Sequence, residues 1–140
     1  MNNEKNFESI ISMKISKNNS KILHASSVEI DGKGVVILGK SGSGKSNLAI
    51  KLISMGAKLI SDDQTYFKLK DNKIIISKPK TTPNFIEARG IGLIKTPMVM
   101  SAKLFCFVNI TNIELERLPY EEKKYCFGKK IKMIEFNPTY

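Results

Sequence analysis

One stretch of the chain decides its fold: residues 34–46, which read GVVILGKSGSGKS. The part from Gly34 to Leu38 is short, apolar and rich in β-branched residues, which is typical of a buried strand. The part that follows, Gly39-x-x-x-x-Gly44-Lys45-Ser46, matches the Walker A pattern of a phosphate-binding loop in full. The stretch therefore predicts a buried strand that runs directly into a phosphate-binding loop.

A helical pattern begins where this stretch ends. Leu48, Leu52 and Met55 recur at helical spacing, and Gly56 stands where a helix C-terminal cap is expected. Strand, loop and helix in this order predict an α/β P-loop domain whose main helix directly follows the Walker A loop.

The physical chemistry of the loop explains its composition. Glycines let successive backbone N–H groups turn toward one anion, and the N-terminus of the helix adds its dipole. Lys45 is expected to reach the β- and γ-phosphates, and the hydroxyl of Ser46 to complete an Mg²⁺ shell. The predicted nucleotide-binding residues are Gly39, Lys40, Ser41, Gly42, Ser43, Gly44, Lys45 and Ser46.

Two further groups point to the same site. Asp62 and Asp63 follow the short apolar strand 58–61, which comes next after the predicted helix. An Asp-Asp pair alone is usually a solvated turn or a helix cap, but in this position it resembles the metal-binding end of a Walker B strand. His24 is the only histidine. Lone histidines are more often structural, yet its place before the P-loop strand favours a position near the phosphates.

The remaining pattern consists mostly of strands. We expect residues 22–30 to form a hairpin with the P-loop strand. A second hairpin should follow, and after it two more strands joined by a short Glu-rich turn. The expected ranges are 66–70, 74–77, 102–110 and 130–136. A strand-rich mixed sheet in a single domain, residues 1–140, follows, with residues 1–19 as a loose N-terminal segment.

Composition limits the other possibilities. The 140 residues carry a net charge of +10, but the lysines are spread along the chain with no basic cluster interleaved with aromatics, so no nucleic-acid role is expected. No apolar run approaches the ~18 residues of a membrane span, and the polar N-terminus has no signal core, which favours a cytoplasmic protein. Cys106 and Cys126, with one histidine, make a structural zinc site improbable, and both are expected to be free thiols.

Four ordered motifs resemble HPr kinase/phosphorylase in its C-terminal catalytic domain. They are His24–Val28, the phosphate-binding loop, Leu59–Asp63 and Ile86–Ile94. The resemblance covers residues 22–94, extends loosely to Leu115–Pro119, and is to the short alphaproteobacterial form of the family. It implies the fold shared by HPr kinases and PEP carboxykinases, ATP and Mg²⁺ as cofactors, and an HPr-type phosphocarrier protein of a phosphotransferase system as substrate. Assembly into hexamers is implied by analogy alone.

The resemblance also implies individual roles. Asp62 would be the general base that takes a proton from the attacking serine of the phosphocarrier. His24 and Arg89 would be the other catalytic residues, His24 near the attacked serine and Arg89 near the transferred group. The metal would be held by Ser46, Asp63 and Glu87.

Three departures from the family pattern leave alternatives open. The chain is too short for the additional N-terminal domain of full-length members. Asn47 stands where the family has an acidic residue after the loop serine. No Pro- and Arg-rich C-terminal loop is present, so phosphorylase activity is not expected. A catalytically weak, ATP-sensing regulatory module and a small-molecule kinase on the same scaffold remain alternatives to an HPr-directed serine kinase.

Overall fold

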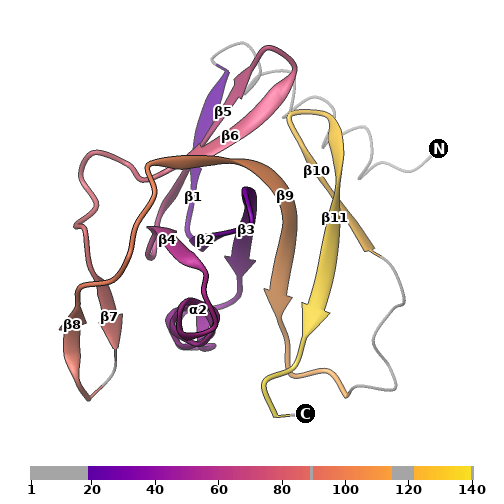
Figure 1. The fold of residues 1–140 in the computed structure, drawn as a ribbon. Helices are drawn as coiled ribbons and strands as arrows, with labels where there is room; N and C mark the ends of the chain where they lie inside the picture. Colours follow the sequence, from indigo (N-terminus) through magenta and orange to yellow (C-terminus); the bar gives the residue numbers. More distant parts are fainter. Residues whose placement is uncertain (1–18, 89, 115–121, 140) are drawn as a thin grey trace.

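The computed structural model describes residues 19–88, 90–114 and 122–139, and within them a strand-rich mixed sheet carries one helix (Figure 1). The elements along the chain are β1 (Ser20–Leu23), β2 (Ser26–Ile30), β3 (Lys33–Leu38), α2 (Lys45–Ser54), β4 (Lys58–Ser61), β5 (Thr65–Lys70), β6 (Lys73–Ser77), β7 (Ile86–Ala88), β8 (Gly92–Ile94), β9 (Ser101–Ile110), β10 (Glu122–Cys126) and β11 (Lys129–Phe136).

Nine of these strands form one sheet. Its order is β1-β5-β6-β9-β3-β2-β4, with β11 paired to β9 and β10 paired to β11, while β7 and β8 form a separate small sheet that projects to one side (Figure 1). β3 pairs in parallel with β9, β9 in parallel with β11, and β2 runs antiparallel to both β3 and β4. β3, β4, β9 and β11 therefore run in one direction and end at one edge of the sheet.

β3 is buried on both faces, which explains its continuous apolar sequence. Val36 joins the cluster around Phe67 and Phe107 on one face, whose rings stack with centroids 6.1 Å apart. Val35 and Ile37 join the cluster on the other face, where Ala49 brings α2 against the sheet. The helix thus covers only one face, and it begins at the edge where β3 ends.

Most of the predicted elements are present: the helix, both hairpins and the strands before Asp62 and around Cys106. The prediction of one strand over residues 22–30 is wrong. The strand breaks at His24 and Ala25, because β1 pairs with β5 whereas β2 pairs with β3 and β4. This break turns the chain outward at the histidine.

The prediction of a turn between the last two strands is wrong in part. β10 occupies residues 122–126 and pairs antiparallel with β11 through a turn at Phe127 and Gly128, both with positive φ. Its sequence, Glu-Lys-Lys-Tyr-Cys, lacks the apolar pattern of a strand, because only Cys126 in it is fully buried. The Leu115–Pro119 stretch of the resemblance and the predicted loose segment, except Asn19, lie outside the described residues.

Both cysteines are free and buried, as expected. Burial raises the pKa of the Cys106 thiol and of the Cys126 thiol, which keeps both sulfurs protonated and poorly nucleophilic. No helix in the described part of the chain is long and apolar enough to cross a membrane.

Two carboxyl groups meet between the C-terminal strands. A hydrogen bond with Glu135, burial and the like charge of Glu135 together raise the pKa of Glu122 from 4.5 to about 7. Glu135 also accepts a hydrogen bond from Asn109 Nδ2 on β9, at 2.9 Å. The pair therefore retains a proton at a pH where an exposed glutamate has lost it.

The folded state binds this proton more tightly than the unfolded chain, so the free energy of unfolding should fall as pH rises from about 4.5 to 7. Glu122→Gln, which mimics the protonated form, should flatten this part of the profile and gain stability relative to wild type toward pH 7. Chemical denaturation at several pH values measures it. An unchanged pH profile in the variant would contradict the assignment.

Gly34 lies at the start of β3 in a crowded position. A Cβ atom built there would lie 2.7 Å from Ile76 Cδ1 and 2.8 Å from the Lys103 carbonyl oxygen. The close approach of β6 and β9 to this backbone therefore requires glycine.

Gly34→Ala should destabilise the domain by about 1–3 kcal/mol, the range for overpacking in a filled core. Ile76→Val removes one of the two colliding atoms, so it should cost less in the Gly34→Ala background than in wild type. Thermal denaturation of the four chains gives the coupling. Full stability of Gly34→Ala would refute the packing argument.

Candidate functional site

The phosphate loop lies between β3 and α2 and depends on two glycines. Gly44 caps the helix with φ of 105°, in the left-handed region that favours glycine. A Cβ on Gly39 would collide with the hydroxyl of Ser43 and come within 3.2 Å of Ile110 Cβ. The loop can therefore close tightly against β9 only with these residues.

Lys45 is the one buried cation of the described residues, and its charge is paired with the loop itself. Its side chain is 8% exposed, and Nζ donates to the carbonyl oxygens of Gly39 at 2.9 Å and Lys40 at 3.2 Å. Neutral carbonyls are weaker partners for an ammonium group than an anionic oxygen. The loop thus holds its cation in position to exchange these partners for a phosphate.

A second group in the loop also has capacity for a ligand. The hydroxyl of Ser43 is shielded from solvent and has no hydrogen-bond partner among the described residues. A buried hydroxyl left unpaired costs free energy, which a bound anion or its hydration can recover. The first turn of α2 carries no acidic residue that would repel such an anion.

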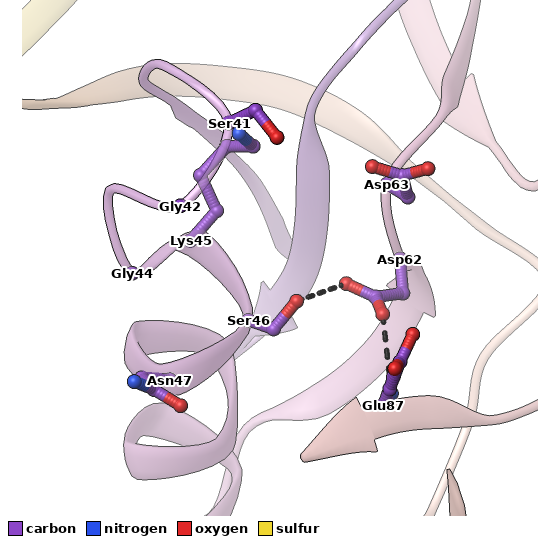
Figure 2. A pocket seen from close by; sticks show the side chains of 9 residues that line it. All are labelled: Ser41, Gly42, Gly44, Lys45, Ser46, Asn47, Asp62, Asp63 and Glu87. Carbon is purple, nitrogen blue, oxygen red and sulfur yellow. Dashed lines mark hydrogen bonds between the residues drawn. The ribbon is translucent and has the colours of Figure 1, made fainter. Parts of the chain in front are cut away.

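Asp62 joins the phosphate loop to the neighbouring strands. It follows β4 and accepts hydrogen bonds from Ser46 Oγ at 2.9 Å, Ser26 Oγ at 2.8 Å and the Glu87 backbone N–H at 3.3 Å. Figure 2 shows Asp62 between Ser46 and Glu87, linked to both. One carboxylate thus connects α2, β2 and β7.

Asp63 points to a different partner. Its Oδ1 lies 2.5 Å from His24 Nε2, and both side chains are largely exposed, at 70% and 61%. Its backbone has a positive φ of 70° and its N–H donates to Ser26 Oγ at 3.2 Å. Because of this turn the two adjacent carboxylates point in different directions. Asp62 points toward the phosphate loop, and Asp63 points toward His24 at the exposed side of the site.

The structure brings most of the predicted residues to one cavity, but Gly39, Lys40 and Ser43 do not line it. A cavity of about 320 Å³ is lined by Ser41, Gly42, Gly44, Lys45, Ser46, Asn47, Asp62, Asp63 and Glu87 (Figure 2). His24 borders the cavity through Asp63. Arg89 lies outside the described residues. The resemblance implied that Asp63 joins Ser46 at the metal and that Asp62 is the general base. In the structure the hydrogen bond of Ser46 is to Asp62.

The oxygen groups present suit Mg²⁺ bound together with a phosphate. The described residues contain no cluster of three or more His, Cys, Asp or Glu side chains poised for a metal. Mg²⁺ commonly keeps several waters and uses one or two carboxylates plus phosphate oxygens. Ser46 Oγ and Asp62 Oδ1, 2.9 Å apart, are the protein groups that would hold such an ion.

Ser26 is a site residue that the sequence prediction missed. Its side chain is fully buried at the start of β2, where it donates to Asp62 Oδ1 and accepts from the Asp63 N–H. It therefore fixes both carboxylates at once. Its place in the His24–Val28 motif, two residues after the only histidine, was the available signal.

Comparisons with known proteins identify relatives of this chain. The family model described as the HPr Serine kinase C-terminal domain matches residues 14–133. The chain is similar to the HPr kinase/phosphorylase of Malacoplasma penetrans, with 33% identity over 88% of this chain and 40% of that protein. A similar protein from Mycoplasmopsis pulmonis is 36% identical over 76% of this chain and 35% of its own length.

A solved structure has the same fold. The Hpr(Ser) kinase/phosphatase of Coxiella burnetii matches with a TM-score of 0.73 and 26% identity, over 84% of this chain and 79% of that one. The predicted fold class is confirmed by this match. This chain spans less than half the length of the two curated relatives named above. With a family model that covers most of its residues, the chain belongs to the HPr kinase/phosphorylase family.

Proposed function

We propose that this domain uses ATP and Mg²⁺ to phosphorylate a serine on an HPr-type phosphocarrier protein. One observation carries the proposal: the hydrogen bond between Ser46 and Asp62, which joins the phosphate loop to a carboxylate that follows β4, a strand parallel to β3 with β2 between them. In P-loop enzymes this serine and this aspartate hold Mg²⁺ against the β- and γ-phosphates. The acceptor follows from the names of the relatives, which are HPr kinases.

Binding and charge neutralisation account for most of the proposed catalysis. Lys45 and the loop N–H groups would hold the phosphates at the N-terminus of α2. When bound, Mg²⁺ supplies a positive charge that offsets the charge on the transferred group. Ser46 and Asp62 would hold this ion, and Glu87 adds a further carboxylate to the same cavity.

Asp63 is the better general base on geometric grounds. Its carboxylate faces solvent at the mouth of the cavity, where a protein hydroxyl can approach, and His24 fixes its orientation. Asp62 already accepts three hydrogen bonds, which hold it against the loop serine and away from an approaching hydroxyl. We therefore propose that Asp63, oriented by His24, takes the proton of the acceptor serine, and that Asp62 and Ser46 hold the metal.

Nucleotide sensing with weak catalysis is the second candidate, and Asn47 favours it. This residue lines the phosphate cavity with a neutral amide, where the family resemblance calls for a carboxylate. On this alternative the domain binds ATP through Lys45 but transfers little phosphate to any acceptor. The expected lack of phosphorylase activity and the assembly into hexamers remain predictions, and a small-molecule acceptor remains an alternative.

The two aspartates should differ in the step that they affect. Asp63→Asn should lower transfer of labelled γ-phosphate to a purified HPr-type protein by about 10²–10⁴-fold, the usual contribution of a general base, and leave Mg²⁺-dependent ATP binding intact. Asp62→Asn should weaken the dependence of ATP binding on Mg²⁺. Isothermal titration calorimetry and a transfer assay measure the two effects.

Lys45→Ala provides the control for both, because it should remove ATP binding itself. No transfer by the wild-type chain, together with intact ATP binding, would favour the sensing alternative. Full transfer by Asp63→Asn would overturn the assignment of the base.

Ser26 and Ser27 form a matched pair. Both are fully buried in β2, but Ser26 bonds to Asp62 whereas Ser27 bonds to Thr65 Oγ1 at 2.9 Å, away from the cavity. Ser26→Ala should lower the transfer rate by about 10- to 100-fold, as expected for loss of a group that orients a metal ligand. Ser27→Ala should lower the melting temperature and spare the rate. Equal effects of both changes on transfer would contradict a positioning role for Ser26.

A further inference from the structure

A second cavity lies at the edge of the sheet where β3, β9 and β11 begin, opposite the phosphate loop. On the side of β9 that faces away from β3, residues 101–103 pair with β6 and residues 106–110 pair with β11. β6 and β11 therefore separate beside Leu104 and Phe105, and Figure 1 shows the β5–β6 and β10–β11 hairpins as separate arms. The turns of these hairpins and the start of β3 line a cavity of about 640 Å³.

Lysines supply the charge of this cavity, which we call the lysine cavity. Among the described residues, five lysines line it and no acidic residue does. They are Lys33, Lys73, Lys103, Lys129 and Lys130. These lysines come from four separate segments of the chain, so the sequence shows no cluster, and only the pairing of the strands creates one.

The five positive charges have no acidic partner among the described residues. None of the ion pairs in that part of the chain involves them, and the aspartates of the adjoining turns, Asp31 and Asp71, do not line the cavity. Lys33 and Lys103 are direct partners in the ladder between β3 and β9. Like charges around one cavity repel one another, and a cavity lined by one sign of charge concentrates counter-ions. The lysine cavity is therefore suited to an anion.

Phe105 adds an aromatic surface beside these charges. Its side chain is 50% exposed although β9 is an inner strand, and Lys33 Nζ lies 4.8 Å from the centroid of its ring. The buried side chains of Ile74 and Leu104 line the same cavity. An aromatic ring and an ammonium group side by side offer stacking and cation–π contacts to a planar ligand.

The rest of the lining narrows the class of ligand. Asn72 is the one described residue of the lining with a neutral polar side chain, and no hydroxyl side chain of the described chain lines the cavity. The hydroxyl groups of a sugar would find few hydrogen-bond partners here, and leaving them unpaired costs free energy. A planar apolar body can instead contact Phe105 and Ile74. The volume of the cavity falls in the range of small-molecule sites.

We propose that the lysine cavity binds a small anion that carries two or more phosphate or carboxylate groups on an aromatic or heteroaromatic body. The lysines supply point charges for the anionic groups, and Phe105 supplies the stacking surface. Charge that converges on one cavity favours a compact ligand over a nucleic-acid strand, which needs a groove that follows its backbone. The lysine cavity shares no lining residue with the phosphate cavity, so the inference does not depend on the proposed function.

Fluorescence titration of the full chain with pyrene tetrasulfonate, a planar anion with four negative groups, tests this site. Lys103→Gln should weaken binding by about fivefold, the upper range for one exposed ion pair. Phe105→Leu keeps an apolar side chain but removes the ring, and should weaken binding by about fivefold as well. Lys58→Gln makes the same change in net charge at an exposed lysine of β4 that lines neither cavity, and should leave binding unchanged.

Competition in the Lys45→Ala chain separates the lysine cavity from the phosphate loop. The probe should bind this variant as tightly as wild type. A nucleoside diphosphate or benzene tricarboxylate should displace it at lower concentration than a sugar bisphosphate does, and the better of the first two identifies phosphate or carboxylate as the preferred group. Borohydride reduction with pyridoxal phosphate should label Lys33 or Lys103, and the probe should suppress this label.

Four results would overturn the inference. Loss of probe binding in Lys45→Ala would place the probe in the phosphate loop. Equal weakening by Lys103→Gln and Lys58→Gln would reduce the site to general charge attraction. Equal displacement by the sugar bisphosphate and the aromatic anions, with no effect of Phe105→Leu, would remove the aromatic requirement. Displacement by single-stranded oligonucleotides that strengthens with their length would assign the lysines to a nucleic-acid strand.

Discussion

The pairing of β3 with its two neighbours is the constraint on which the rest of this domain depends. β9 joins it in parallel on one edge and β2 joins it antiparallel on the other. The parallel side brings the ends of β9 and β11 next to the phosphate loop. The antiparallel side inserts β2 between β3 and β4, so that Ser26 and His24 arrive from the opposite direction to meet Asp62 and Asp63. Both halves of the site are thus consequences of strand direction.

The charges and dipoles at the phosphate loop favour the binding of an anion. Lys45 is buried and held by two carbonyl oxygens, and the N-terminus of α2 lacks an acidic residue. The carboxylates stand across the cavity, where they repel a phosphate unless a cation lies between them. A phosphate and a divalent cation that enter together satisfy both sides, which is the physical basis for expecting joint binding of nucleotide and metal.

Ser26 shows how much one small buried group can order. Its hydroxyl uses its donor for Asp62 and an acceptor position for the Asp63 N–H, so neither aspartate is free to rotate toward the other's partner. The strained φ of Asp63 belongs to the same arrangement. The two adjacent aspartates thereby have different partners: Asp62 contacts Ser46, and Asp63 contacts His24.

The sequence by itself determined the strand, loop and helix around residues 34–54, because these depend on local spacing, glycine positions and hydrophobic periodicity. It also indicated Asp62, Asp63, His24 and Glu87 as members of one site. Only the tertiary structure decided which aspartate meets Ser46, since that depends on a backbone turn at Asp63 and on Ser26, which lies 36 residues away from Asp62. A cavity on the β9 side of the phosphate loop could not be predicted from the sequence either, because its walls come from the loops after β3, β9 and β11, which only the pairing of those strands brings together.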